Sequence, residues 1–129
     1  MTVHATQGRH VLADLHGITA TWLTDVQALQ NLLVEAAQHA GAHVLGAHFH
    51  HFGENAGVTG VVMLSESHIS IHTWPEHGFA ALDIFMCGQA RPASALQYVR
   101  QALSPTDAQV TNVDRGRQER QLRHSTQRT

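Results

Sequence analysis

Four stretches with the composition of β-strands follow one another in the middle of the chain, joined by connections of two to five residues. Gly, Asn, Pro, Ser and Glu fill these connections, and such short links join strands that run in opposite directions. The sequence therefore predicts a mainly antiparallel sheet. The four predicted strands are residues 42–52, 58–64, 67–73 and 79–87.

Two amphipathic segments flank this central block. The first is predicted to begin at a capping box formed by Thr24 and Gln27 and to end at Gly41, and the second runs from Pro92 to Ser104-Pro105. Further strands are expected at residues 9–15 and 108–113. We expect an α+β fold, a two-layer α/β sandwich with both helices on one face of the sheet. The apolar stripes that indicate the helices are Val26, Leu29, Leu32, Leu33, Ala36, Ala37 and Ala40 in the first, and Leu96, Val99 and Leu103 in the second.

The strand at residues 79–87 predicts a second layer of packing, because it is apolar on both sides. Side chains alternate between the two faces of a strand. Two helices cover only one sheet face, so we expect a homodimer or higher assembly in which two sheets stack into a four-layer sandwich. The two sets are Ala80, Leu82, Ile84 and Met86 on one side, and Phe79, Ala81, Phe85 and Cys87 on the other.

Size and composition narrow the class of protein. With 129 residues and a formal net charge of −2, the chain fits one domain and offers no strong attraction for nucleic acid or a membrane surface. A single cysteine and the lack of a long hydrophobic span favour the cytoplasm. We expect one domain over residues 1–113. Residues 114–129 read as a basic polar tail that is disordered.

The Glu66-Ser67 bond, followed by His72, has the layout of a chain that cuts itself. The Ser67 hydroxyl can attack the Glu66 carbonyl and convert the amide into an ester. A nearby imidazole can then remove the Ser67 α-hydrogen, which eliminates the ester. The dehydroalanine that remains hydrolyses to a pyruvoyl group, a covalent cofactor made from the chain itself.

The basic residues exclude one competing cofactor. All eight are arginine and the chain has no lysine. Pyridoxal-phosphate enzymes hold their cofactor on a lysine, so that class is excluded. A decarboxylase without lysine needs a built-in carbonyl as its electron sink, and a pyruvoyl group is such a carbonyl.

The segment from Leu64 to Glu76, with residues 57–62, residues 80–88 and Gly8-Arg9-His10, resembles the short prokaryotic S-adenosylmethionine decarboxylase proenzymes. The resemblance runs from about Gly8 to Gly116. It implies decarboxylation of S-adenosylmethionine to the aminopropyl donor for spermidine, in a homodimer of processed protomers. The implied roles are Glu66-Ser67 as cleavage site, Ser67 as pyruvoyl precursor, His72 as processing base, Cys87 as proton donor, Thr59 as processing support, and Phe52, Trp74 and Glu76 as substrate-binding residues.

Three alternatives remain open from the sequence. A pyruvoyl enzyme of this fold could instead decarboxylate ornithine or arginine, because the departures from the family pattern fall where substrate would bind. A non-catalytic regulatory relative is a second alternative. The third is a metal-binding protein, since the chain has twelve histidines, including His48, His50, His51, His68 and His72. We expect no metal, because this spacing has low specificity.

Strand alternation sets a condition on self-cleavage. In a straight strand Ser67 and His72 point to opposite faces. The hypothesis therefore requires a sharp bend or strand break at Glu66-Ser67, which would expose the scissile carbonyl and strain its peptide.

Overall fold

The computed structural model describes residues 6–116, in which six strands and three helices form two layers. The elements confirm the predicted α+β sandwich. In chain order they are β1 (Gly8–His16), α1 (Ala20–Leu23), α2 (Val26–His39), β2 (Val44–His51), β3 (Val58–Leu64), β4 (Ser67–Trp74), the 3-10 turn η1 (Pro75–His77), β5 (Phe79–Cys87), α3 (Pro92–Leu103) and β6 (Asp107–Arg115).

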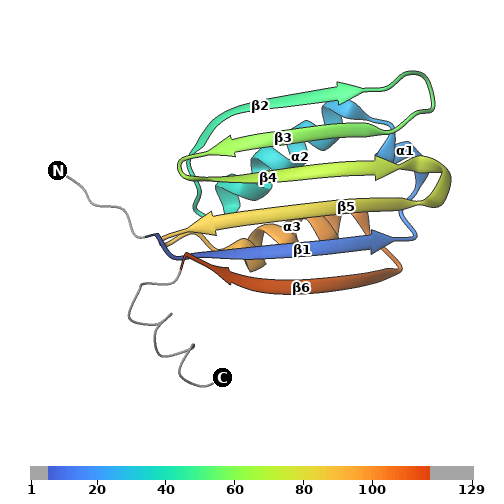
Figure 1. Cartoon of the computed structure of the whole chain (residues 1–129). Helices are drawn as coiled ribbons and strands as arrows, with labels where there is room; N and C mark the ends of the chain where they lie inside the picture. The colour runs from blue at the N-terminus through green and yellow to red at the C-terminus, as the bar shows by residue number, and fades with distance from the viewer. Residues whose placement is uncertain (1–5, 117–129) are drawn as a thin grey trace.

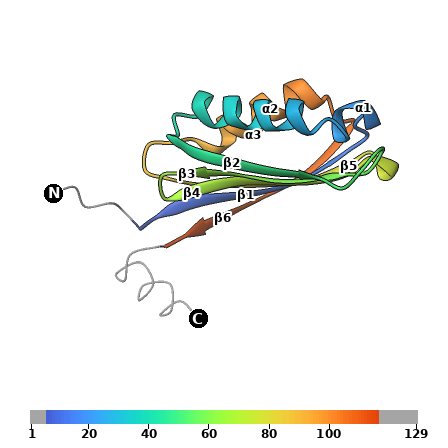
Figure 2. The same cartoon turned by 90° about the horizontal axis from the view of Figure 1, so that it is seen from above.

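All six strands belong to one sheet in the order β2-β3-β4-β5-β1-β6 (Figure 1). Every neighbouring pair is antiparallel, as the short connections predicted. The helices lie on one side of the sheet, and no other element within residues 6–116 covers the opposite side (Figure 2). The uncovered side is called the open face below.

The core lies between the sheet and α2 and α3. Alternate residues of β3, β4 and β5 point into it, while their neighbours point to the open face. Burial of these apolar side chains is the main source of stability. The largest fully buried side chains are Leu15, Leu23, Leu29, Leu33, Val58, Val62, Ile69, Ile71, Ile84, Met86 and Val99.

The structure corrects the predicted start of the first long helix. Asp25, not Thr24, is the N-cap of α2, and its carboxylate accepts a hydrogen bond from the Ala28 amide at 3.0 Å. The Thr24 hydroxyl instead donates to the Ala20 carbonyl at 3.0 Å, at the end of α1. α1 is not one of the two helices that the sequence predicts, since four residues carry too little periodicity to reveal a helix.

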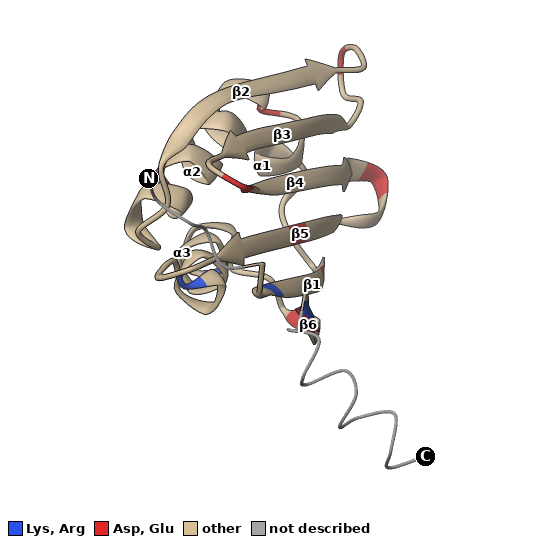
Figure 3. Cartoon of the chain, turned by 60° about the vertical axis from the view of Figure 1, so that its left-hand side comes forward, with Lys and Arg blue, Asp and Glu red and all other residues tan. Residues whose placement is uncertain are grey.

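The last strand extends beyond the predicted end of the domain. β6 runs to Arg115, so Asp114 and Arg115 pair with β1 and are not part of a disordered tail. The rest of the expected tail, residues 117–129, lies outside the described residues. Figure 3 shows that the basic positions of the described part gather around α3, β1 and β6. No helix within residues 6–116 has the length and apolar character needed to cross a membrane.

Thr73 is a buried polar link between the sheet and α1. Its hydroxyl donates to the Leu23 carbonyl at 2.7 Å and accepts from the Val58 amide at 2.9 Å. Thr73→Val keeps the shape but leaves both backbone groups buried without a partner. We expect the free energy of unfolding to fall by roughly 2 to 4 kcal/mol, measured by urea denaturation. Thr111→Val on exposed β6 is the matched control, and an equal loss in both variants would contradict this explanation.

Candidate active site

The turn between β3 and β4 contains the Glu66-Ser67 bond. Glu66 has φ of +67°, a left-handed conformation that is unfavourable for a residue with a side chain. The Ser65 amide donates to the His43 carbonyl at 3.1 Å, and the Ser67 hydroxyl lies 3.4 Å from the Ser65 carbonyl. The sharp bend predicted at Glu66-Ser67 is therefore confirmed, and it places local strain next to the bond.

Cys87 reaches this turn from the end of β5. Its Sγ lies 3.6 Å from the Glu66 carbonyl oxygen, within reach of a weak S–H hydrogen bond. Gly8 lies opposite Cys87 in the sheet. A Cβ at Gly8 would come 2.7 Å from the Phe85 ring and 3.0 Å from the Cys87 Sγ, so the absence of a side chain there gives both groups their space.

The surroundings of Cys87 keep its thiol protonated. Burial raises the pKa of Cys87 above its ordinary value, and the nearby Glu66 carboxylate raises this pKa further. The thiol therefore loses its proton only as the pH rises through this elevated pKa. A protonated thiol at physiological pH suits a hydrogen-bond donor and a proton donor, and it is a poor nucleophile.

We expect Glu66→Gln to lower the pKa of Cys87 only in part, because burial is the larger cause. Cys87 is the one cysteine of the chain, so ultraviolet absorbance of the thiolate reports on it alone. The titration is best done with Ser67→Ala as the background, which keeps the 66–67 bond intact. A Cys87 pKa below that of free cysteine in Ser67→Ala would contradict the assigned protonation state.

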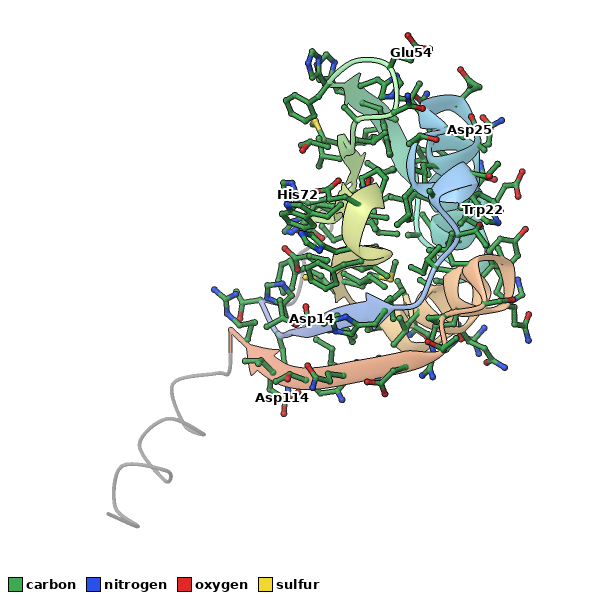
Figure 4. All side chains as sticks on the ribbon, turned by 90° about the vertical axis from the view of Figure 1, so that its right-hand side faces the viewer. Asp14, Trp22, Asp25, Glu54, His72 and Asp114 are labelled. Carbon is green, nitrogen blue, oxygen red and sulfur yellow. The ribbon has the colours of Figure 1, made fainter. Side chains whose placement is uncertain are left out.

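Thr59 and His72 come together at the opposite end of the sheet. The Thr59 Oγ1 lies 3.0 Å from the His72 Nδ1, across the β3–β4 pair. His72 points away from the helices, onto the open face (Figure 4). The structure thus joins the expected processing base to its expected support.

An aromatic row continues from His72 along the same end. The ring centroid of His72 lies 6.3 Å from that of Trp74, and the Trp74 ring stacks on Phe79 with 5.1 Å between centroids. Phe79 in turn stacks on His16 at 4.9 Å. Glu76 follows in η1. Phe52 lies just beyond β2 and is 63% exposed, with His50 packed edge-on against its ring.

The two groups of candidate residues are far apart within one chain. Ser67 begins β4 and His72 lies five residues further along the same uninterrupted strand. At about 3.3 Å per residue the separation is roughly 16 Å, and the two side chains alternate to opposite faces. The bend at Glu66 exposes the scissile bond without bringing His72 to Ser67. A single chain therefore holds half of the expected site at each end of its sheet.

One cluster of ionisable groups escaped the sequence interpretation. His10, His68 and Asp83 come from three adjacent strands, and their ligand atoms lie within 4.8 Å of one another. This set differs from the histidines that the sequence suggested as metal ligands, of which it shares only His68. The signal available was Asp83 itself, a carboxylate on a strand that is otherwise apolar.

The fold and the site together define a class: a two-layer α+β domain in which a thiol lies against the carbonyl of a strained Glu-Ser turn. The family model for S-adenosylmethionine decarboxylase matches residues 9–116. The S-adenosylmethionine decarboxylase proenzyme of Moorella thermoacetica is 43% identical over 110 residues, covering 84% of this chain and 87% of that protein. The chain belongs to the S-adenosylmethionine decarboxylase family.

Two further matches agree with this assignment. The S-adenosylmethionine decarboxylase proenzyme of Syntrophomonas wolfei is 46% identical over 110 residues, covering 84% of this chain and 86% of that protein. The crystal structure of the adenosylmethionine decarboxylase from Aquifex aeolicus matches with a TM-score of 0.81 at 37% identity. That match covers 89% of this chain and 95% of the other, so nearly the whole domain is shared.

Proposed function

We propose that this protein is a proenzyme that cuts itself between Glu66 and Ser67, turns Ser67 into a pyruvoyl group, and decarboxylates S-adenosylmethionine. The observation that carries the proposal is the contact between the Cys87 thiol and the Glu66 carbonyl at a strained turn. Family membership and the names of the relatives give the substrate. The product is the aminopropyl donor of polyamine synthesis. A free cysteine that takes part in the reaction stays reduced in the cytoplasm, which favours that compartment.

The residues at the turn fit the processing chemistry. The Cys87 S–H donates toward the Glu66 oxygen, which is where negative charge develops when the Ser67 hydroxyl attacks. The C–N bond of the peptide then breaks and leaves Glu66 joined to the Ser67 oxygen as an ester. Removal of the Ser67 α-hydrogen breaks the bond between that oxygen and the Ser67 Cβ, so that Glu66 leaves as a carboxylate at the end of the first fragment and residue 67 becomes a dehydroalanine, which hydrolyses to the pyruvoyl group with loss of ammonia. Strain in the left-handed Glu66 is released by that cleavage.

The same residues fit a pyruvoyl group at position 67. A pyruvoyl group supplies a carbonyl that accepts the electrons of the bond to the departing carboxylate. Position 67 begins β4, next to the Glu66 carbonyl that Cys87 contacts. A protonated thiol at that place delivers a proton to the substrate α-carbon. Its raised pKa keeps the thiol in the protonated form before this transfer.

A second chain supplies the other half of the site. The open face carries exposed apolar side chains that a monomer leaves in water, namely Leu12, Met63, Trp74 and Val113. In a symmetric dimer two open faces stack, and the same patch serves both chains. With the strands of the two sheets running in opposite directions, Thr59 and His72 of one chain lie beside Ser67 and Cys87 of its partner. The imidazole then reaches the Ser67 α-hydrogen that it must remove.

The aromatic row offers a surface for the substrate. Trp74, Phe79 and His16 stack in sequence beside His72. The faces of such rings attract a sulfonium cation and stack on a purine. Glu76 adds a carboxylate acceptor for hydroxyl groups, and exposed Phe52 extends the row from the end of β2.

Release of carbon dioxide from carboxyl-labelled S-adenosylmethionine, ornithine and arginine tests the substrate. We expect release from S-adenosylmethionine alone, and none of the comparisons points to the two basic amino acids. Trp74→Ala should raise KM for S-adenosylmethionine by about tenfold or more, through loss of stacking. Release from ornithine or arginine at a comparable rate would contradict the substrate assignment, while leaving self-cleavage open to its own test.

A further inference from the structure

Self-cleavage removes the covalent support of the first residue of β4, and this consequence rests on the proposed function. Ser67 pairs only with Leu64 of β3, whereas the ladder to β5 begins with the pair His68 and Phe85. After a cut at 66–67, residue 67 is a new chain end, and chain ends fray unless they are tied down. His68 is therefore the first residue of the new fragment that β5 can hold.

Asp83 of β5 collects contacts from both neighbouring strands on the open face. The His68 Nε2 lies 3.4 Å from its Oδ2, and the Ser70 hydroxyl lies 3.5 Å from the same oxygen. On the other side, the His10 Nε2 contacts the Oδ1. Two of these three partners belong to the first four residues after the cleavage point.

Arg115 of β6 determines which ring nitrogen of His10 carries the proton. The Arg115 Nη1 lies 3.1 Å from the His10 Nδ1, and a guanidinium only donates hydrogen bonds. The Nδ1 therefore accepts, so the single proton of the neutral ring is on Nε2, which donates it to Asp83. These contacts join β6, β1, β5 and β4, and we call Arg115, His10, Asp83, His68 and Ser70 the Asp83 network.

The same arrangement disfavours a metal ion among His10, His68 and Asp83. A metal would bind the His10 Nε2 after that nitrogen had lost its proton. The proton would then move to Nδ1, where Arg115 already points a donor. Metal-bound histidines normally donate their second nitrogen to an acceptor, which is the opposite of what Arg115 provides. Hydrogen bonding accounts for the cluster without this conflict.

The Asp83 network also surrounds the residue that packs beside Cys87. Ring centroids of His10 and His68 lie 5.4 and 5.9 Å from that of Phe85, and the Arg115 guanidinium carbon lies 5.9 Å from it. Phe85 shares with Cys87 the space left open by Gly8. The Asp83 network thus contacts the strand that follows the new chain end at residue 67, and it also contacts Phe85, the ring that packs beside Cys87.

We propose that Asp83 is a positioning residue, which holds the start of β4 in register through His68 and Ser70. Residue 67 then stays next to the His68–Phe85 pair, at the end of the β4–β5 ladder that leads to Cys87, after the chain has been cut. Before the cut, the intact turn performs this task as well. The contribution of Asp83 is therefore specific to the cleaved protein.

Hydrogen exchange of the backbone amides at residues 68–71 tests this proposal without relying on activity. Asp83→Asn should raise their exchange about tenfold in the cleaved protein, through loss of the charged acceptor. In the uncleaved Ser67→Ala background the same substitution should raise it less than about threefold, because the turn still ties the strand. Asp107→Asn, a carboxylate at the exposed start of β6, is the matched control.

The outcomes separate the proposal from its alternatives. Equal exchange effects of Asp83→Asn in the cleaved and uncleaved proteins would overturn it, as would no effect in either. Failure of the wild-type chain to cleave would overturn the proposed function itself. One equivalent of tightly bound zinc, lost in Asp83→Asn and required for protection of residues 68–71, would also overturn the proposal and favour a metal site.

In the expected case, kcat of cleaved Asp83→Asn falls while KM changes little.

Discussion

A chain carrying His72→Ala will remain uncleaved when it is expressed alone, and it will be cleaved when it is expressed together with a Ser67→Ala chain. This result follows from the separation of roughly 16 Å between Ser67 and His72 along β4. In the mixed dimer the Ser67→Ala chain contributes an intact His72 to its partner. One of the two sites in such a dimer is complete, so only the His72→Ala chain is cut.

Mass spectrometry distinguishes the chains if one of them carries a small tag. His48→Ala is the matched control, since this histidine is exposed and lies on the open face, where β2 pairs with β3. It should be cleaved whether expressed alone or mixed. If the mixed dimer stays uncut, or if His72→Ala alone is cut at the normal rate, the proposal of a site shared between two chains is wrong.

Cys87→Ala will lower the kcat of decarboxylation by at least about 100-fold, the usual contribution of a positioned proton donor. Cleavage should continue at a reduced rate, because the Glu66 carbonyl loses one weak donor and keeps its strained conformation. The measurement compares the rate of fragment formation with carbon dioxide release from the fully cleaved variant.

Cys87→Ser separates the two contributions of the thiol. A hydroxyl still donates to the Glu66 carbonyl but is a much weaker acid than a thiol. We expect near-normal cleavage together with a large loss of kcat. A cleaved Cys87→Ala protein with normal steady turnover would remove Cys87 from the decarboxylation step.

The architecture was readable from the sequence because local signals agreed with one another. Turn residues between 64 and 67 and between 87 and 92 fixed strand and helix ends, and β3, β5 and α3 have the predicted bounds. Alternation along β5 correctly separated its buried residues from those on the open face. The start of α2 was misplaced because Thr24 and Asp25 are both good capping residues, and only the backbone geometry decides between them.

The arrangement of the site was less accessible. The self-cleavage hypothesis required a bend at Glu66-Ser67, and the structure has one. The sequence could not show that Cys87 meets the Glu66 carbonyl, because this contact depends on the register of β4 against β5. The Asp83 network depends on four strands that are distant in the chain. Only the sheet order β4-β5-β1-β6 brings these residues together.

The mass of the intact protein tests the central claim most directly. The wild-type chain, purified in its folded state, should give two fragments, residues 1–66 and residues 67–129, with the second blocked to N-terminal sequencing by a pyruvoyl group. The Ser67→Ala chain should give one mass corresponding to all 129 residues. A folded wild-type protein that keeps the mass of a single uncut chain would contradict self-cleavage between Glu66 and Ser67.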